Sequence, residues 1–177
     1  GGEAERLGRI IDDLLDLSRI EANETPQATL VPVADVVAEA VQSLRSVATG
    51  LEVTLHVGAM APNLMVAGDR RDLVSAVANL VENSLKYVAA GGHIDIRAQA
   101  ADKRVWLVVA DDGPGIAQQD RAAALKPFVR LALAQAKEGS GLGLSLVAAI
   151  ARLHHAQLLL EDNQPGLRVR LGLAAGV

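Results

Sequence analysis

The chain of 177 residues contains no cysteine, which excludes disulfide bonds and thiolate metal sites and fits a reducing compartment. Only one Trp, one Tyr and one Phe are present although half of the residues are hydrophobic, so the core must be built from Leu, Val, Ile and Ala. No apolar run is long enough to cross a membrane, and the N-terminus lacks a signal-peptide pattern. The net charge is −4 and long basic runs are missing, so nucleic acid is not expected as a partner. These absences indicate a cytoplasmic globular protein.

Residues 3–21 predict an amphipathic helix that stands apart from the rest of the chain. Its apolar side chains recur at 3-4 spacing and form a wide stripe: Leu7, Ile10, Ile11, Leu14, Leu15 and Leu17. An ordinary surface helix of one globule would show the same pattern. We favour a helix of a bundle or coiled coil, because residues 23–27 are typical of a linker and a helix of about five turns needs a partner to bury its stripe. We therefore expect two parts, residues 1–23 and 28–177.

From residue 28 onward the pattern alternates between helices and strands. Apolar periodicity predicts helices at residues 33–47, 70–88 and 142–153. Short strands are predicted at 28–31, 51–57 and 65–67, and two hairpins pair 93–99 with 104–110 and 158–161 with 167–173. Residues 118–135 are rich in Ala and follow no single period. This order predicts an α+β fold, a two-layer sandwich in which helices cover one face of a mixed sheet.

Four polar residues share one face of the predicted 70–88 helix: Asn79, Glu82, Asn83 and Lys86. A carboxamide oxygen is a neutral hard ligand suited to Mg²⁺, which takes its remaining oxygens from water and substrate phosphates. Asn79 and Asn83, one turn apart, can therefore bind a metal and orient phosphates, with Lys86 adding positive charge. A polar stripe that only faces solvent would have the same spacing, so this helix alone does not decide between the two.

Two glycine-containing segments add to this pattern. Residues 111–116, Asp-Asp-Gly-Pro-Gly-Ile, follow a strand directly, where Asp111 can accept a hydrogen bond from an exocyclic amino group such as that of adenine. A plain β-turn with Pro at its second position is the alternative, and Asp112 is expected to be the structural residue of the acidic pair. Residues 139–144, Gly-Ser-Gly-Leu-Gly-Leu, open a helix whose N–H groups can face an anion. Their spacing fits neither a dinucleotide fingerprint nor a P-loop.

In this order the segments resemble the ATP-binding module of bacterial sensor histidine kinases, part of a wider family shared with DNA gyrase, MutL and the ninety-kilodalton heat-shock chaperone. Residues 79–87 resemble the family's N box, 111–116 its G1 box, 125–130 its F box and 139–144 its G2 box. Residues 14–21 resemble the end of the second helix of the dimerisation and phosphoacceptor hairpin. The ordered set is specific although no single box is, and the resemblance covers nearly the whole chain.

The resemblance implies a site for ATP and Mg²⁺. Asn83 would ligate Mg²⁺, Asn79 would lie beside the phosphates, and Lys86 and Tyr87 would face phosphate and sugar. Asp111 would accept from the adenine N6 amino group. The other residues implied to shape the pocket or contact the nucleotide are Gly113, Gly115, Ile116, Gly139, Gly141, Leu142, Gly143 and Leu144. A mobile lid would span roughly residues 118–140, and Arg130 would reach the γ-phosphate when it closes.

The chain also departs from the family pattern. The family's phosphoacceptor His is followed by an acidic residue and Leu, which none of the four histidines matches: His56, His93, His154 and His155. Nor are they spaced as zinc ligands, so structural roles are expected. We therefore expect a chain that binds ATP but does not phosphorylate itself at the usual position. Leu125 stands where an aromatic residue is common, which would loosen lid docking, and Ala156 follows two histidines where the family shows His-Gly-Gly, which would change the local turn.

The implied partners are ATP, a response-regulator receiver domain and a second copy of the kinase through the dimerisation helices, with any membrane attachment through parts outside this chain. Three other functions would use related features of the sequence. A degenerate kinase that holds nucleotide only to regulate dimerisation is disfavoured by the full N, G1 and G2 boxes. A free-standing anti-sigma serine kinase would not need the helix at residues 3–21. A gyrase or chaperone ATPase would carry Glu as its base in place of Asn79, and Asn cannot take that proton.

Overall fold

The computed structural model describes residues 2–129 and 140–176. A five-stranded mixed sheet has the order β2-β4-β5-β7-β6. Its strands are β2 (Thr54–Val57), β4 (His93–Ala101), β5 (Arg104–Asp111), β6 (Gln157–Asp162) and β7 (Leu167–Ala174). The edge strand β2 runs parallel to β4, and the other neighbours are antiparallel. A small antiparallel sheet pairs β1 (Thr29–Pro32) with β3 (Met65–Gly68).

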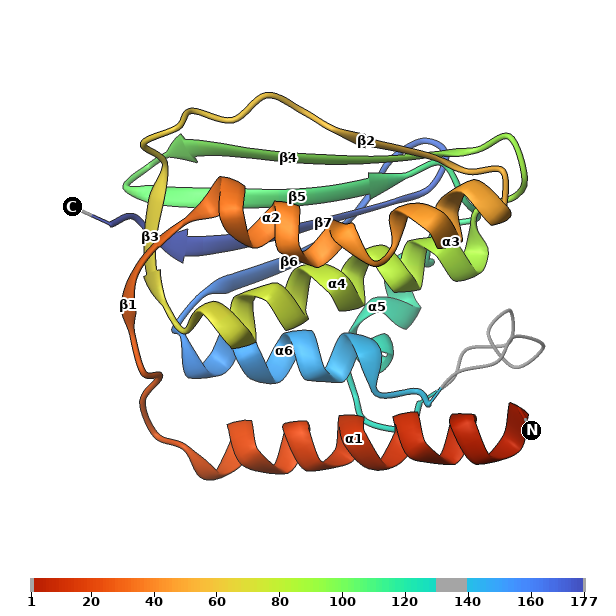
Figure 1. Cartoon of the computed structure of the whole chain (residues 1–177), viewed down its shortest axis with the longest axis horizontal. Helices are drawn as coiled ribbons and strands as arrows, with labels where there is room; N and C mark the ends of the chain where they lie inside the picture. The colour runs from red at the N-terminus through yellow and green to blue at the C-terminus, as the bar shows by residue number, and fades with distance from the viewer. Residues whose placement is uncertain (1, 130–139, 177) are drawn as a thin grey trace.

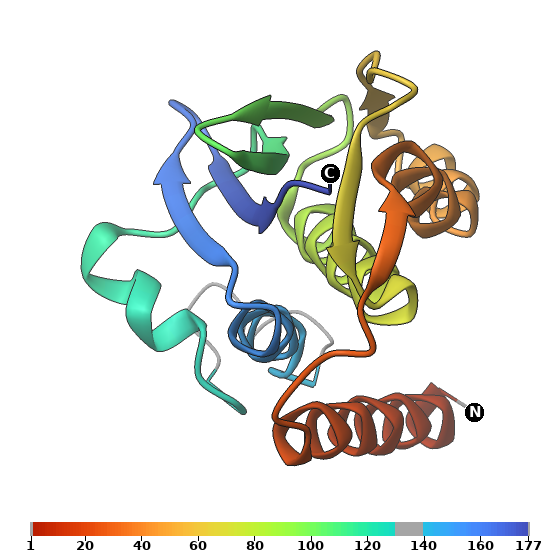
Figure 2. The same ribbon diagram turned by 90° about the vertical axis from the view of Figure 1, so that its left-hand side faces the viewer.

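The main helices lie on one face of the five-stranded sheet (Figures 1 and 2). They are α2 (Val33–Gln42), α4 (Arg70–Tyr87) and α6 (Gly143–Leu153), and α1 (Gly2–Ala22) lies alongside α6 on its outer side. The shorter helices are α3 (Arg45–Gly50), the 3₁₀ turn η1 (Gln118–Asp120) and α5 (Arg121–Ala124). Within the described residues, no helix is both long and apolar enough to cross a bilayer. The predicted two-layer α+β sandwich, a mixed sheet with its helices on one face, is confirmed.

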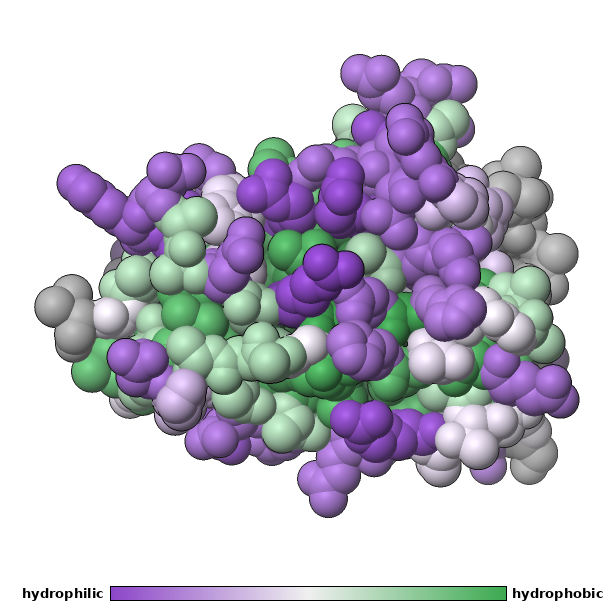
Figure 3. All heavy atoms as spheres, turned by 90° about the horizontal axis from the view of Figure 1, so that it is seen from above, coloured by the Kyte–Doolittle hydropathy of each residue, from purple (hydrophilic) through white to green (hydrophobic). Residues whose placement is uncertain are grey.

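Strand β5 shows how the core is built almost without aromatic residues. Val105, Leu107 and Val109 alternate toward the helices and are buried. Trp106 points to the opposite face, which no main helix covers, yet it is only 8% exposed. The Arg170 guanidinium lies 4.4 Å from the centroid of its ring and covers it. Part of the same side of the sheet is seen in Figure 3, where hydrophilic side chains spread over much of the surface.

Two predicted elements differ from the structure. The helix predicted at residues 33–47 is broken into α2 and α3 by a turn at Ser43 and Leu44, which lets Leu44 and Ala48 both reach the core. The strand predicted at 51–57 starts only at Thr54, because Glu52 takes a left-handed conformation (φ 58°) that reverses the chain after α3. Both predicted hairpins are present.

Helix α1 is attached to the rest of the molecule along its C-terminal half. Leu17 and Ile20 are 4% and 2% exposed in the common core, and the helix ends where Asn23 donates to the Arg19 carbonyl. Toward the N-terminus the apolar stripe is uncovered, at Leu7, Ile11, Leu14 and Leu15. The proposed division into 1–23 and 28–177 stays a prediction, as does the partner helix for the exposed part of the stripe.

Candidate functional site

Asp111 ends β5 with a carboxylate that is 5% exposed and firmly held. Its Oδ1 accepts hydrogen bonds from the main-chain N–H groups of Gly113 (2.9 Å) and Leu167 (3.2 Å). Its Oδ2 accepts from the Ser84 hydroxyl at 2.7 Å. The two carboxylate oxygens of Asp111 have about four lone-pair positions, and three of them accept hydrogen bonds within the protein. The remaining position can accept one more hydrogen bond, from a donor on a ligand.

Sequence reasoning missed Ser84, although it left a signal. The residue occupies a core-facing position of α4, one turn beyond Leu80 and Val81, and a polar side chain among apolar ones needs a buried partner. Asp111 is that partner. The contribution of Leu167 left no such signal, because it is made through a main-chain N–H group 56 residues from Asp111 in sequence.

The glycines of the 111–116 segment permit close packing of the chain on itself. Gly115 has φ 72°, and a Cβ there would lie 2.8 Å from the Gly166 carbonyl oxygen. A Cβ on Gly113 would lie 3.2 Å from Asp111 Oδ1. The next residue, Ile116, is half-buried against the core, and its carbonyl accepts from Arg121 Nε (3.1 Å). These contacts hold the loop that follows Asp111 close to the carboxylate.

The N-terminus of α6 meets the middle of α4. A Cβ built on Gly143 would lie 3.5 Å from Asn79 Oδ1, so the glycine lies directly against the Asn79 carboxamide. The Asn79 amino group donates to the Ser75 carbonyl at 2.8 Å, which leaves Oδ1 on the α6 side. Because Asn79 and Ser84 are five residues apart on one helix, about 7.5 Å along its axis, α4 connects the glycine segment to Asp111.

The loop that leads into α6 is fixed by hydrogen bonds. Ser140 Oγ accepts from the Leu142 N–H (3.1 Å), and the Gly141 carbonyl accepts from the Phe128 N–H (3.0 Å). Gly141 itself has φ 74°. Leu142 is fully buried in the core, and Leu144 is partly buried against it. The Phe128–Gly141 hydrogen bond thus brings the 125–129 and 140–144 segments together.

Asn83 lies one turn beyond Asn79 on α4 and is half-buried. Within residues 2–129 and 140–176 its carboxamide has no hydrogen-bond partner. Lys86 and Tyr87 follow on the same helix, with Lys86 exposed and Tyr87 half-buried. Among the described residues, no group of three His, Asp or Glu side chains converges to hold a metal. The Asn83 amide oxygen is a neutral ligand of the kind that suits Mg²⁺. That ion completes its coordination shell with water and with the phosphate oxygens of a ligand, so a single protein donor fits it.

Helix α1 contributes acidic charge next to this region. Asp13 Oδ2 accepts from the Ser140 hydroxyl at 3.0 Å, so α1 contacts the loop before α6. Burial raises the pKa of Asp13, against the lowering effect of that hydrogen bond. Burial likewise raises the pKa of Glu82, although its side chain still reaches solvent, and Lys86 opposes the rise. Asp13 of α1 also contributes to the raised pKa of Glu82 on α4, so the two carboxylates are close enough for their charges to interact.

Arg130 and Gly139 lie outside the described residues, as does most of the predicted lid between η1–α5 and Ser140. The predicted mobility of residues 118–140 therefore stays a prediction. Phe128 in the F-box segment is 59% exposed, with φ 62°. The turn after α6 has His155 at φ 50°, a conformation that glycine adopts more easily.

His154 has a structural role. Its Nε2 accepts from the Asp69 N–H at 3.0 Å, and its Nδ1 lies 2.9 Å from the Ile150 carbonyl. This pattern requires a neutral ring with the proton on Nδ1. On the uncovered side of the sheet, His56 contacts Asp95 and His93 contacts Asp112. All three pairings fit the structural roles that the sequence predicts for these residues.

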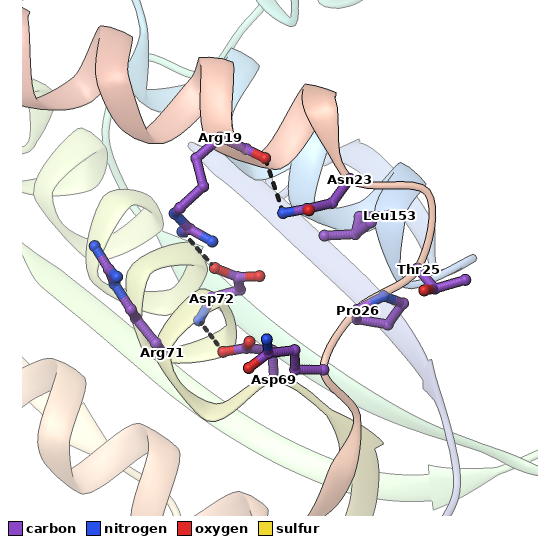
Figure 4. Close-up of a pocket in the computed structure, with 9 residues that line it drawn as sticks. Arg19, Asn23, Thr25, Pro26, Asp69, Arg71, Asp72 and Leu153 are labelled. Atoms are coloured by element: carbon purple, nitrogen blue, oxygen red, sulfur yellow. Dashed lines mark hydrogen bonds and ion pairs between the residues drawn. The ribbon is translucent and has the colours of Figure 1, made fainter.

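A polar cavity of about 380 Å³ lies at the other end of α4, between the end of α1, the linker and Leu153 (Figure 4). Arg19 from α1 and Asp72 from α4 form an ion pair of 2.7 Å there, and the Asp72 N–H donates to Asp69 Oδ1. Of the residues predicted to bind nucleotide, none that the structure describes lines this cavity. It belongs to the junction between α1 and the sandwich.

Comparison with known proteins matches residues 68–176 to the family described as Histidine kinase-, DNA gyrase B-, and HSP90-like ATPase, which is more than half of the chain. The signal transduction histidine-protein kinase/phosphatase MprB of Mycobacterium bovis is 35% identical over 165 residues, which cover 93% of this chain and 32% of MprB. The chain thus spans about a third of the length of this relative.

Solved structures agree with this match. The mycobacterial sensor histidine kinase MprB superposes with a TM-score of 0.72 and 27% identity, over 84% of this chain and 97% of that one. The Acinetobacter baumannii histidine kinase AdeS has a TM-score of 0.81 over 99% of this chain and 82% of its own. At 21% identity the second likeness supports the fold, and it extends over α1 as well.

Proposed function

Because the chain belongs to the histidine kinase-, DNA gyrase B- and HSP90-like ATPase family, as the ATPase domain of a sensor histidine kinase, we propose that it binds Mg²⁺-ATP and donates the γ-phosphate to a histidine outside this sequence. An Asp of a response-regulator receiver domain would receive the group next. The observation that carries the proposal is that one helix, α4, contacts both Asp111 through Ser84 and the glycine segment through Asn79.

Asp111 is proposed to recognise the base. Oδ1 is occupied by two N–H donors and Oδ2 by one hydroxyl, so the carboxylate offers a ligand an acceptor and no donor. The amino group at position 6 of adenine satisfies that acceptor. The carbonyl at the same position of guanine would meet it with a lone pair and leave a buried polar group unpaired, which costs binding free energy.

The phosphates are proposed to lie between α4 and the start of α6. The main-chain N–H groups there, Asn79 and Lys86 would orient and neutralise them, with Gly139 and Arg130 from the adjoining segment. Asn83 would hold Mg²⁺, which when bound neutralises charge on the phosphate oxygens. Phosphoryl transfer depends mainly on positioning and charge neutralisation, and these residues provide both.

The acceptor is proposed to be a histidine outside this chain. Both ring nitrogens of His154 are engaged within the fold, and the rings of His56 and His93 contact carboxylates across the sheet from the helices. Asn79 cannot act as a general base, which favours transfer to a protein nucleophile over hydrolysis by activated water. A dependence on ATP also favours a cytoplasmic location for this part of the parent protein.

A second copy of the kinase is proposed to cover the open part of α1. Leu7, Ile11 and Leu15 are each more than half exposed there, on the stripe that resembles a dimerisation helix. Apolar residues repeated at this spacing are typical of helices that pack in pairs. The exposed stripe therefore supports the dimeric partner that the sequence implies.

Calorimetry with a non-hydrolysable ATP analogue and Mg²⁺ tests the binding proposal. Asp111→Asn replaces one acceptor oxygen by an amino group, and we expect affinity to fall about tenfold or more, as for loss of a hydrogen bond to a charged group. Asp112→Asn is the matched control, because Asp112 contacts His93 and not the Ser84 side. Equal affinities for the unaltered chain and Asp111→Asn would remove the base-recognition role.

Phosphoryl transfer is tested by mixing the chain with a second fragment of the parent that carries its phosphoacceptor helix. Radioactive γ-phosphate from ATP should appear on a histidine of that fragment. A chain that binds the analogue but labels nothing would instead be a regulatory nucleotide-binding module.

A further inference from the structure

The turn between β6 and β7 contacts Asp111 in three ways. The Asn163 side-chain amide donates to the Asp111 carbonyl at 2.7 Å, and the Leu167 N–H donates to Asp111 Oδ1 at 3.2 Å. Gly166 lies so close that a Cβ there would be 1.8 Å from the same carbonyl oxygen. These residues are more than fifty positions from Asp111 in sequence.

Asn163 is itself held in place. Its N–H donates to the Gly166 carbonyl at 3.0 Å, which closes the turn, and its side chain is half-buried. The paired register of β5 and β7 stops at Ala110 and Arg168. The first carbonyl beyond that ladder belongs to Asp111, and the Asn163 side chain supplies its donor. The side chain of Asp111 in turn faces the proposed base site.

We propose that Asn163 is a positioning residue for base recognition, which fixes the main chain of Asp111 so that Oδ2 points at the amino group of the base. The inference rests on the proposed binding of ATP. Without the Asn163 donor, the Asp111 carbonyl is left to hydrogen-bond to water. The peptide that follows is then held only by the 3.3 Å bond from the Asp112 N–H to the His93 carbonyl, and its orientation is less well fixed. The carboxylate then no longer keeps one oxygen on the turn and the other toward Ser84.

A positioning role has a consequence that a purely structural role lacks. Only interactions with the base depend on the direction of Oδ2, whereas the phosphates are proposed to bind about a helix turn or more away, at Asn79 and the start of α6. Loss of Asn163 should therefore weaken adenine nucleotides selectively. The preference for adenine over guanine should decline, and affinity for the phosphate chain alone should not.

The test uses the full chain with Asn163→Ala, Asn163→Asp and the control Asn63→Ala, since Asn63 is an exposed loop residue. Calorimetry measures the dissociation constants of Mg²⁺ complexes of a non-hydrolysable ATP analogue, the corresponding GTP analogue and inorganic tripolyphosphate. For Asn163→Ala we expect about a fivefold loss with the adenine analogue, as for one hydrogen bond, and no change with tripolyphosphate. Asn163→Asp should lose more, because a carboxylate oxygen would face the Asp111 carbonyl oxygen.

Parallel losses for all three ligands, or an unchanged adenine-to-guanine ratio in a folded variant, would overturn the positioning role while leaving the proposed function in place. Failure of the unaltered chain to bind the ATP analogue would overturn the proposed function and this inference with it. If Asn163→Ala does not fold, Asn163→Ser carries the same comparison, because its shorter side chain cannot span to the carbonyl. Thermal unfolding of each variant identifies that case.

Discussion

The ion pair between Arg19 and Asp72 offers a quantitative test of how α1 is attached to the sandwich. The Asp72 side chain is 2% exposed, and Arg19 Nη2 lies 2.7 Å from its Oδ1. Arg19→Met keeps most of the apolar stem and removes the charge. A buried carboxylate would then lose its counter-ion, which is among the largest penalties that a single substitution causes.

The magnitude follows from burial. Removing one partner of a fully buried pair costs about 3–5 kcal/mol. The Arg19 side chain is 35% exposed, so water can reach part of the vacated position, and the position of Asp72 in the first turn of α4 also stabilises its charge. We therefore expect a loss of about 2–3 kcal/mol. Arg19→Met combined with Asp72→Asn should recover more than half of it, because an amide is far cheaper to bury than an unpaired charge.

Urea unfolding of the two single variants and the double variant gives the coupling free energy directly. Arg71→Met is the control, since Arg71 is 73% exposed, contacts Asp16 at 3.4 Å and should change stability by less than about 0.5 kcal/mol. Hydrogen exchange adds a local measurement, because undocking of α1 should speed exchange in α1 while α4 stays protected. A loss for Arg19→Met no larger than for Arg71→Met, with unchanged exchange in α1, would refute the reasoning.

Two further predictions follow from the backbone and from charge. His155→Gly should raise the free energy of unfolding by up to about 1 kcal/mol and the melting temperature by about 2–4 °C, because φ 50° strains a residue that has a Cβ. The control His155→Ala keeps the Cβ and should give no gain. Equal melting curves for all three chains would contradict the strain. The hydrogen bond from the main-chain N–H of His93 lowers the pKa of Asp112 in the folded chain, below the unfolded value of about 3.9. The ionised Asp112 carboxylate therefore stabilises the folded chain at neutral pH, and this contribution is lost as the pH falls through the folded pKa. Asp112→Asn should therefore be less stable than the unaltered chain by under about 1 kcal/mol at pH 7, with the difference shrinking below about pH 4; a difference that grows in acid would contradict the sign.

Much of the secondary structure could be predicted because it depends on short-range patterns. The 3-4 spacing of α4 places Asn79 and Asn83 on one side and Leu73 and Leu80 on the core side, and the structure buries both leucines. The β4–β5 hairpin turns at Asp102 and Lys103, where positive φ angles make the reversal, as the short polar interruption indicates. In the same way Asp112 binds the His93 N–H, in the structural role expected of it.

Other features could not be read from the chain. The helix expected at residues 33–47 continues its apolar period through the break at Ser43, so no local signal marks the turn that seats Leu44 in the core. The pairing of β1 with β3 depends on main-chain hydrogen bonds that carry no preference for a side chain. The docking of α1 depends on Arg19 and Asp72, which are 53 residues apart.

By itself, the order of residues along this chain determined which segments are helices and strands and which groups are available for metal, phosphate and base, because periodicity and side-chain chemistry are local properties. Tertiary structure alone decided that Ser84, Leu167 and Asn163 hold Asp111, and that Gly143 lies against Asn79. Those contacts join elements that only sheet pairing and helix packing bring together. Two of them use a main-chain group, the Leu167 N–H as donor and the Asp111 carbonyl as acceptor. Every residue type has a carbonyl and nearly every one an N–H, so no pattern of side chains could have indicated these two contacts.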